Sequence, residues 1–322
     1  MTRTMVMLAE PEVPMEEWAS AVSAAAPGLR VLVAPDHAAA MHLLPDADAA
    51  FGTLDAQLLA RAGRLAWLQA PQAAPPAGYF FPQLVAHPVQ VTNFRGIYND
   101  HVALHAVAML LALARGLPRY LRQQQRHEWI RHLADQDILH LPESTVLVVG
   151  VGGIGGEIAR MVHALGANVI GLDPRRTEPP AGMEAIFPPH QLDTLLPVAD
   201  AVVLTLPHTP QSEGMIDARR LALMRTHALL VNVGRGATVR LQALTDALRA
   251  GRLGGAALDV FEQEPLPPGH PLWNEPRALL TPHVAVVGPY IVERRLAVLC
   301  DNARRFASGE PLVNVVDKAN WY

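Results

Sequence analysis

Several stretches of the sequence carry residues whose types and spacing could do chemistry. VLVVGVGGIGGEIAR, residues 146–160, places Gly150, Gly152 and Gly155 in the pattern G-x-G-x-x-G, between an apolar run and a helix-like run. In this pattern the first glycine permits a tight turn, the second lets the backbone approach a pyrophosphate, and the third lets the helix pack on the strand. The phosphate meets unpaired N–H groups at the positive end of that helix. This context indicates dinucleotide binding rather than an ordinary structural turn.

A carboxylate follows the next predicted strand. Asp173 comes about 20 residues after the glycines, where a dinucleotide-binding fold places the acid that binds the ribose 2′-OH. Its negative charge would repel a 2′-phosphate, so it favours NAD. Arg175 and Arg176 follow in DPRR, and guanidinium groups bind phosphate well, so NADP stays open as the alternative.

Three further stretches carry the groups that a hydride-transfer reaction on a carbonyl needs. NVGRGA places Arg235 between two glycines, and a guanidinium can bind a carboxylate through two parallel hydrogen bonds. LLTPH carries His283 directly after a predicted strand, and ALDVFEQEP carries Asp259, Glu262 and Glu264. Histidine suits the proton donor because its ordinary pKa lies near neutrality. A nearby carboxylate would orient the ring and favour its charged form.

The composition favours a soluble globular protein and excludes several classes. Of the 322 residues 50% are apolar and 17% are charged, and the net charge of −4 includes no basic block that would indicate nucleic acid binding. The longest apolar run, residues 102–114, is shorter than the roughly 20 residues of a membrane span, and the N-terminal stretch does not resemble a secretory signal. Cys300 is the only cysteine, so no internal disulfide can form and we expect a reduced, cytoplasmic setting.

Lysine and histidine usage narrows the mechanism further. Lys318 is the only lysine, which argues against short-chain dehydrogenases, β-hydroxyacid dehydrogenases and aldolase-type enzymes. His101 and His105 are spaced i, i+4 on a predicted helix, as metal ligands can be. That helix is strongly apolar and has no attendant glutamate, so we expect no metal.

The alternation of predicted strands and helices indicates two α/β units, each with a parallel sheet. Strands are expected at 5–8, 29–34, 47–52, 65–70 and 89–93, and then at 145–149, 167–173, 199–207, 227–233, 254–260 and 278–283. Helices are expected at 14–26, 54–63, 100–116, 119–132, 153–165 and 292–307. Ligands gather at the carboxyl ends of such strands, so the loops 71–83 and 93–100 are candidate substrate loops.

The ordered set GVGGIG, LDP, LPHTPQSEGMID, VNVGRG, ALDVFEQEP and TPH resembles the D-isomer-specific 2-hydroxyacid dehydrogenase family, in particular its glyoxylate and hydroxypyruvate reductases. The resemblance implies a doubly wound Rossmann domain inserted into a smaller, flavodoxin-like α/β substrate domain. We therefore expect the first part of the substrate domain at 1–100, the NAD(P)-binding domain at 101–288 and a returning C-terminal helix at 289–322. Two long helices, near 100–116 and 289–307, would form a hinge whose closure excludes water.

The resemblance also implies roles for individual residues. His283 would be the general acid in reduction of a 2-oxo acid and the base in the reverse direction. Glu264, rather than Glu262, would pair with it, Arg235 would hold the substrate, and Asp259 would contact the nicotinamide end. The expected cofactor-binding residues are Gly150, Gly152, Gly153, Ile154, Gly155, Asp173, Arg175, Pro207, Val233, Gly234 and Asp259, and the expected substrate-binding residues are Ala73, Ala74, Arg95 and Gly96.

Family members are usually dimers through the cofactor domain, and residues 117–140 are the candidate arm. The loop QAAPPAGYF, the helix sequence at 103–105 and the segment VAVVGP after His283 depart from the family pattern near the expected substrate cleft, so they leave the substrate open. Glyoxylate and hydroxypyruvate are the first candidates, and nothing favours 3-phosphoglycerate. A dinucleotide-sensing co-regulator or binding protein on the same fold is the alternative. An L-hydroxyacid dehydrogenase is disfavoured because its glycine turn would lie near the N-terminus.

Overall fold

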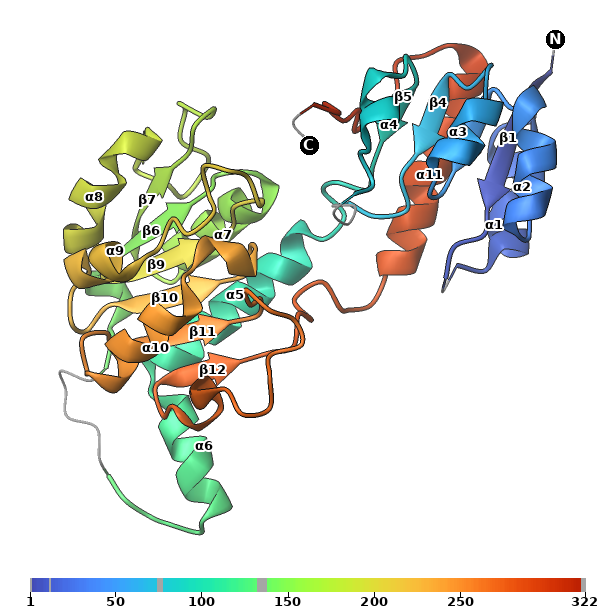
Figure 1. Cartoon of the computed structure of the whole chain (residues 1–322). Helices are drawn as coiled ribbons and strands as arrows, with labels where there is room; N and C mark the ends of the chain where they lie inside the picture. Colours follow the sequence, from blue (N-terminus) through green and yellow to red (C-terminus); the bar gives the residue numbers. More distant parts are fainter. Residues whose placement is uncertain (1, 12, 74–77, 132–137, 320–322) are drawn as a thin grey trace. The chain divides into compact units, whose positions relative to one another are not determined.

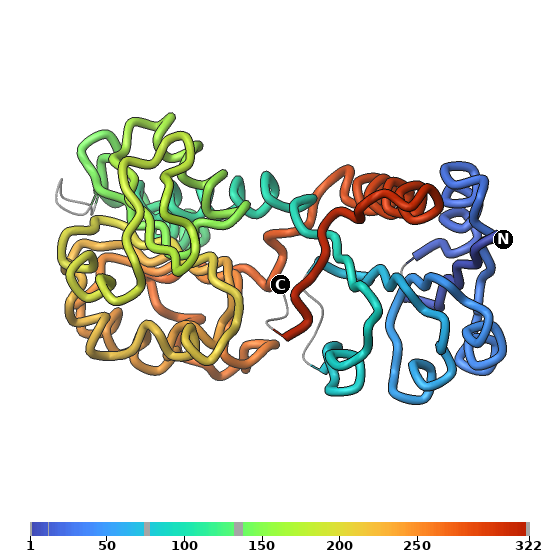
Figure 2. The backbone as a smooth tube through the Cα atoms, turned by 90° about the horizontal axis from the view of Figure 1, so that it is seen from above, coloured from blue at the N-terminus to red at the C-terminus, as the bar shows by residue number. Residues whose placement is uncertain are grey.

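The computed structural model describes residues 2–11, 13–73, 78–131 and 138–319, and the chain forms two compact units. The first unit joins Met1–Ile97 to Pro289–Tyr322, and the second comprises Tyr98–Gly288. The chain leaves the first unit after β5 (Gln90–Thr92), completes the second unit, and returns to the first for α11 (Ile291–Ser308) (Figures 1 and 2). The second unit is therefore an insertion, which confirms the predicted architecture.

The first unit is built on a five-stranded parallel sheet in the order β2-β1-β3-β4-β5, which is the flavodoxin-like order. Trp18 of α1 contacts Phe51, and Phe306 of α11 contacts Trp67, so these two adjacent helices cover one face. Three shorter helices pack against the other face. The elements are β1 (Arg3–Leu8), α1 (Met15–Ala25), β2 (Leu29–Ala34), α2 (His37–Leu43), β3 (Ala49–Phe51), α3 (Ala56–Arg61), β4 (Trp67–Gln69) and α4 (Pro82–Ala86), with β5 and α11.

A buried polar network fastens α11 to this sheet. The Asn302 side chain, fully buried on α11, donates to Gln69 Oε1 (3.2 Å) and to the Val313 carbonyl oxygen (3.1 Å), and accepts from the Val313 N–H (2.8 Å). Gln69 Oε1 also accepts from the Thr92 hydroxyl (2.7 Å), which in turn accepts from Trp67 Nε1 (2.8 Å). Because every polar group named here has a hydrogen-bond partner, the network specifies one position of α11 on the sheet.

The second unit is built on a seven-stranded parallel sheet in the order β12-β11-β10-β9-β6-β7-β8. Its first six strands in chain order follow the doubly wound Rossmann arrangement, and β12 extends one edge. The strands are β6 (Thr145–Val149), β7 (Asn168–Leu172), β8 (Ala185–Phe187), β9 (Ala201–Leu204), β10 (Leu229–Asn232), β11 (Gly255–Leu258) and β12 (Ala278–Leu280). The helices are α5 (Asn99–Ala114), α6 (Leu117–Gln125), α7 (Gly153–Ala164), α8 (Leu192–Leu195), α9 (Ala218–Leu223) and α10 (Leu241–Arg249).

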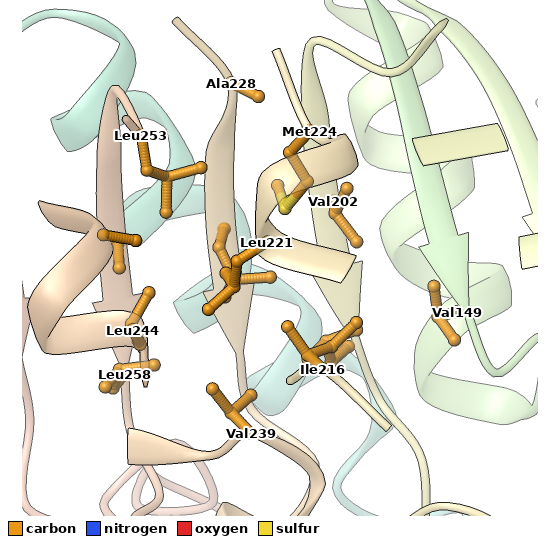
Figure 3. Close-up of a cluster of buried hydrophobic side chains, with 14 of the residues drawn as sticks. Val149, Val202, Ile216, Leu221, Met224, Ala228, Val239, Leu244, Leu253 and Leu258 are labelled. Carbon is orange, nitrogen blue, oxygen red and sulfur yellow. The ribbon is translucent and has the colours of Figure 1, made fainter. Parts of the chain in front are cut away.

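Apolar side chains cover both faces of this sheet, as the near-continuous apolar strands require. Val146, Val148 and Val203 pack against α5 and α7 on one face. Val149 and Val202 face the opposite way, towards α8, α9 and α10, and Figure 3 shows that cluster, in which Leu221 and Leu244 meet the strands. Each such side chain contributes roughly 1.5–3 kcal/mol when fully buried. The sheet therefore holds its carboxyl edge, where the candidate residues lie, on a rigid base.

The predicted helix over 119–132 is wrong over 126–131, and residue 132 lies outside the described residues. The N–H of Glu128 bonds to the Gln123 carbonyl oxygen (3.0 Å) and the N–H of His127 to that of Gln124 (3.1 Å), and His127 takes a left-handed φ of 57°. These bonds satisfy the last helical carbonyl groups and end the helix. No single helix of the described residues is long and apolar enough for a membrane span, and α5 with α6 reaches that composition only across a bend of 74°.

Candidate active site

The glycine turn between β6 and α7 has the shape of a phosphate cradle. Gly150 has a φ of 96°, which favours glycine, and its carbonyl oxygen accepts from the Thr205 hydroxyl (2.6 Å). A Cβ on Gly155 would overlap that same carbonyl oxygen, so only glycine lets α7 come this close. Gly152 precedes the first turn of α7, and no side chain of the described residues caps that turn, so backbone N–H groups are available to an anion.

Asp173 lies against this turn. Its Oδ2 accepts from the Val151 N–H (2.8 Å), and its Oδ1 accepts from the N–H groups of Arg175 (2.8 Å) and Arg176 (2.9 Å). The Arg176 guanidinium donates to the carbonyl oxygens of Val151 and Glu178, both at 3.2 Å. The carboxylate is therefore fixed beside the glycine turn, at the place where the ribose of a dinucleotide is expected, and Arg176 is engaged with the main chain.

His283 and Glu264 form a close pair at the carboxyl edge of the sheet. His283 Nδ1 lies 2.7 Å from Glu264 Oε2, and Glu264 Oε1 accepts from the Phe261 N–H (2.9 Å). The two side chains are 46% and 34% exposed. Because Glu264 engages Nδ1, Nε2 is the ring nitrogen left to exchange a proton with a substrate.

Glu262 has a different environment. Its Oε2 accepts from the N–H of Leu241 (2.6 Å) at the start of α10, and its Oε1 accepts from the Arg240 guanidinium (3.2 Å). Its carboxylate thus satisfies the first turn of that helix. Of the two candidate acids, the structure brings only Glu264 to His283.

Arg235 lies on a tight turn that packs against other segments of the same polypeptide. Burial lowers the pKa of its guanidinium, and the charge of Glu264 opposes that change. Asn232, which is fully buried, accepts from the Gly234 N–H (3.1 Å) and donates to the Arg235 carbonyl oxygen (3.0 Å). A Cβ on Gly236 would overlap the main chain of Phe261, so this turn packs against the segment that carries Glu264.

Asp259 is almost fully buried, at 1% exposure. Its Oδ1 accepts from the Thr281 hydroxyl (2.6 Å) and the Val284 N–H (2.9 Å), and its Oδ2 accepts from the Ala285 N–H (3.0 Å). The carboxylate therefore holds the segment around His283. Its predicted contact with the nicotinamide end stays a prediction.

The remaining cofactor candidates also lie in the second unit. Ile154 packs from α7 into the apolar face shared with α5. The N–H of Val233 bonds to the Leu204 carbonyl oxygen (3.1 Å), and the Pro207 carbonyl oxygen accepts from the Ser212 hydroxyl (2.7 Å). Both lie just beyond strand ends, so the candidates share one edge of the sheet.

The substrate candidates lie in the first unit, after β4 and β5. Asn93 joins two of them, because it donates to the Ala73 carbonyl oxygen (2.8 Å) and accepts from the Arg95 N–H (3.0 Å). Gly96 is exposed and has a left-handed φ of 98°. Ala74 lies outside the described residues.

The two helical histidines have different partners. His101 Nδ1 lies 3.0 Å from Asp100, and His105 Nε2 lies 3.0 Å from the Thr281 hydroxyl. Within the described ranges no three His, Cys, Asp or Glu side chains are grouped as metal ligands.

Sequence reasoning missed four polar residues that hold the site: Thr205, Asn232, Thr281 and His105. Asn232 and Thr281 carried a signal, because each is a polar residue at the end of an apolar strand, where a side chain can reach the next loop. Thr205 carried none, and the spacing of His105 suggested only a metal ligand, since the partners of both residues lie far away in the chain.

Comparisons with known proteins show the family to which the chain belongs. A model of the family "D-isomer specific 2-hydroxyacid dehydrogenase, NAD binding domain" matches residues 107–285. The glycerate dehydrogenase of Methylorubrum extorquens is 32% identical over 241 residues, which cover 72% of this chain and 73% of that protein. A D-isomer specific 2-hydroxyacid dehydrogenase from Xanthobacter autotrophicus, solved with NADPH and MES, has a TM-score of 0.82 and 30% identity, covering 99% of both chains. The NADPH-dependent glyoxylate/hydroxypyruvate reductase of Sinorhizobium meliloti, solved with NADP and sulfate, has a TM-score of 0.80 and 30% identity, covering 99% of this chain and all of that one.

The chain belongs to the D-isomer specific 2-hydroxyacid dehydrogenase family. It is an NAD(P)-dependent oxidoreductase that interconverts 2-hydroxy and 2-oxo acids. The predicted family, fold and reaction class are thereby confirmed.

Proposed function

We propose that this enzyme reduces small 2-oxo acids, with His283 as the proton donor, Glu264 as its partner and Arg235 as the group that binds the substrate carboxylate and carbonyl. The observation that carries the proposal is the 2.7 Å contact between His283 Nδ1 and Glu264 Oε2, next to the turn of Arg235. When bound, the nicotinamide cofactor supplies the hydride.

The chain's own residues divide the remaining work. Arg235 orients the substrate through charge-assisted hydrogen bonds to its carboxylate. His283 Nε2 donates a proton to the carbonyl oxygen as that oxygen gains negative charge. Glu264 holds the ring by Nδ1 and stabilises the imidazolium that is present before the transfer. In the reverse direction the neutral ring accepts the proton of the hydroxyl group.

The residues of the glycine turn fit a dinucleotide, and we propose NAD as the preferred form. The cradle at Gly150, Gly152 and Gly155 accommodates a pyrophosphate, and Gly153, Ile154, Pro207, Val233, Gly234 and Asp259 would line the rest of the cofactor site. Asp173 would accept hydrogen bonds from the ribose hydroxyl groups and repel a 2′-phosphate. Arg175 and Arg176, which follow Asp173, are the residues that would favour NADP instead, because guanidinium groups bind phosphate well.

Glyoxylate and hydroxypyruvate are the proposed first substrates. The named relatives that act on glyoxylate, hydroxypyruvate and glycerate support this choice. On the first unit, Arg95 and the backbone around Gly96, Ala73 and Ala74 would bind the substrate. Residues 1–100 with 289–322 would thus serve as the substrate domain, residues 101–288 would serve as the cofactor domain, and the helices near 100–116 and 289–307 would form the hinge.

We also propose a homodimer, formed through the cofactor domain, in a cytoplasmic setting. The predicted arm at 117–140 supports the dimer as far as it is described, because α6 and the residues up to 131 expose Leu121 (53%) and Trp129 (92%). Residues 132–137 of that arm lie outside the described ranges. Permanent protein interfaces bury exposed apolar and aromatic side chains of this kind.

A panel of 2-oxo acids assayed with NADH and with NADPH tests the substrate and cofactor choices together. We expect turnover of glyoxylate and hydroxypyruvate, with a higher kcat/KM for NADH than for NADPH. Arg235→Ala should raise the KM for the 2-oxo acid by about 100-fold or more, because removing a charged hydrogen-bond partner of the carboxylate costs roughly 3 kcal/mol. Unchanged 2-oxo acid kinetics in Arg235→Ala would remove this residue from the substrate site.

A further inference from the structure

We propose that His105 and Thr281 are positioning residues for the Asp259 carboxylate, which in turn holds His283 in its reactive position. The three side chains form one chain of contacts within the second unit. His105 Nε2 lies 3.0 Å from the Thr281 hydroxyl, and that hydroxyl lies 2.6 Å from Asp259 Oδ1. The inference rests on the proposed role of His283 as proton donor.

The direction of each hydrogen bond follows from the chemistry of the three groups. An ionised carboxylate only accepts, so Thr281 must give its single hydroxyl hydrogen to Asp259. The Thr281 oxygen is then an acceptor towards His105, so His105 Nε2 must carry the hydrogen of that contact. The hydroxyl has one competing acceptor in the Met109 sulfur, but that atom is 4.0 Å away. His105 therefore keeps the Thr281 hydrogen aimed at the carboxylate.

Asp259 needs this donor because its carboxylate is buried. A buried carboxylate that loses a hydrogen-bond donor is destabilised, because no water replaces the lost donor. The other donors are the N–H groups of Val284 and Ala285, which belong to the segment just after His283. His105 Nε2 also lies 3.6 Å from Asp259 Oδ1, so the ring packs directly beside the carboxylate.

His283 itself depends on such anchoring. Its φ is 53°, in the left-handed region that non-glycine residues seldom occupy. Its N–H bonds to the carbonyl oxygens of Asp259 (2.8 Å) and Thr281 (3.1 Å), and the Asp259 carboxylate holds the two residues that follow it. Such a conformation persists when the surroundings over-determine it. Weakening the Asp259 contacts frees the segment 281–285 and lets the imidazole leave its place beside Glu264.

A set of paired substitutions tests the inference by steady-state kinetics of 2-oxo acid reduction. His105→Leu and Thr281→Val remove the donor and the hydroxyl with little change in size, whereas His105→Gln and Thr281→Ser keep them. We expect His105→Leu and Thr281→Val to lower kcat by about 10- to 100-fold, as misplacement of a reacting group by about 1 Å can do. His105→Gln and Thr281→Ser should recover most of kcat.

Thr245→Val is the matched control for the loss of a buried hydroxyl. Thr245 is fully buried, and its hydroxyl bonds only to the Leu241 carbonyl oxygen within α10 (2.8 Å) among the contacts of the described residues, so kcat should stay unchanged. A kcat for His105→Leu and Thr281→Val equal to that of the unmodified enzyme would overturn the inference. The same conclusion follows if His105→Gln and Thr281→Ser lose as much activity as their partners, since the side-chain shape would then matter and the hydrogen bonds would not.

His283→Asn, assayed in parallel, separates this inference from the proposed function. Full turnover in His283→Asn would overturn the proposed proton donor and, with it, the role of His105. A large loss in His283→Asn beside full activity in His105→Leu would overturn the His105 inference alone.

Discussion

Glu262 and Glu264 lie two positions apart and have different partners. Glu264 engages His283 Nδ1, while Glu262 accepts from the first N–H of α10 and from Arg240. The pattern ALDVFEQEP left both acids as candidates, because a sequence does not reveal which way successive side chains of an irregular loop point. The loop conformation after β11 makes that distinction.

The two acids provide a matched pair of substitutions. Glu264→Gln should lower kcat/KM for 2-oxo acid reduction by about 100-fold, because the charge that stabilises the His283 imidazolium is lost. Glu262→Gln should leave kcat/KM unchanged and lower the free energy of unfolding by about 1 kcal/mol, the typical contribution of a helix cap. Steady-state kinetics and urea unfolding of both variants check this, and equal losses of activity would refute the assignment.

At the residue scale, the sequence allowed prediction of the groups that could do chemistry but not of those that hold them. Arg235, Glu264 and His283 stood out because their types suit the reaction and they follow predicted strands. The contact between Thr281 and His105 could not be predicted, because it joins α5 to the segment after β12. Such contacts depend on tertiary packing, which residue spacing does not encode.

At the element scale, the turn between β6 and α7 is the feature most sensitive to added volume. Gly155→Ala should raise the Kd for NADH at least about tenfold, or about 1.4 kcal/mol, because its Cβ would overlap the Gly150 carbonyl oxygen and open the cradle. Gly156→Ala is the control, since the nearest atom to its Cβ is Arg176 Nη1 at 3.7 Å. That variant should bind NADH normally and gain up to about 1 kcal/mol of stability from helix propensity. Fluorescence titration with NADH measures both, and normal binding by Gly155→Ala would contradict the account of the turn.

At the opposite edge of the same sheet, where β6 begins, the Asp200 carboxylate accepts several hydrogen bonds that stabilise the fold. Asp200 Oδ2 accepts from the Thr145 N–H at the start of β6 (2.8 Å), and Oδ1 contacts Arg225 (2.5 Å) and His227 (2.9 Å). Burial acts to raise the pKa of the Asp200 carboxyl, but the hydrogen bonds from His227, Thr145 and Arg225 outweigh it and hold the pKa below its ordinary value.

Because the pKa of Asp200 is lower in the folded state, the contribution of this carboxylate to the free energy of unfolding depends on pH. The stabilisation is present above the unfolded-state pKa of about 3.9 and is lost as the pH falls through the lower, folded-state value. Asp200→Asn should lower the free energy of unfolding by about 1–2 kcal/mol at pH 7, and the difference from the unmodified protein should shrink below about pH 4. Urea unfolding at pH 7, 5 and 3.5 checks this, and a difference that grows in acid would contradict it.

Elements with strong patterns were predicted well, and their ends less so. The buried parallel strands can be identified in the sequence as apolar runs, and β2 and β6 have the predicted bounds. The helix predicted over 119–132 ends early because His127 adopts a left-handed conformation that nothing in RYLRQQQRHEWIRH signals. The edge strand β8 is short and half-buried, so it lacks the apolar run that identified its neighbours.

At the scale of the whole molecule, the position of the glycine turn in the chain predicted that one domain is inserted into another. A cofactor turn at residue 150 requires another unit before it, and the return of α11 to the first sheet through Asn302 completes an inserted arrangement. The order of motifs predicted this layout. The sequence could not supply the buried polar network that fastens α11, because its members come from three distant segments.

The proposed dimer makes a prediction at this scale. Leu121→Asp should convert the protein from a dimer to a monomer of 34.8 kDa in light scattering, because it places a charge where an apolar interface is expected. Val198→Asp is the control, since Val198 is also exposed (47%) but lies outside the arm. A monomeric unmodified protein would contradict the proposed dimer. A Leu121→Asp variant that stays dimeric would contradict the proposal that the arm forms the interface.

The most direct test of the account is the rate of 2-oxo acid reduction by His283→Asn, measured together with NADH binding. Asparagine tolerates the left-handed backbone at this position and fills part of the same space, but it cannot donate the proton. We predict that kcat/KM for glyoxylate falls about 100- to 10,000-fold while the Kd for NADH stays unchanged. Turnover of glyoxylate by His283→Asn at the rate of the unmodified enzyme would contradict the central claim that His283 is the proton donor.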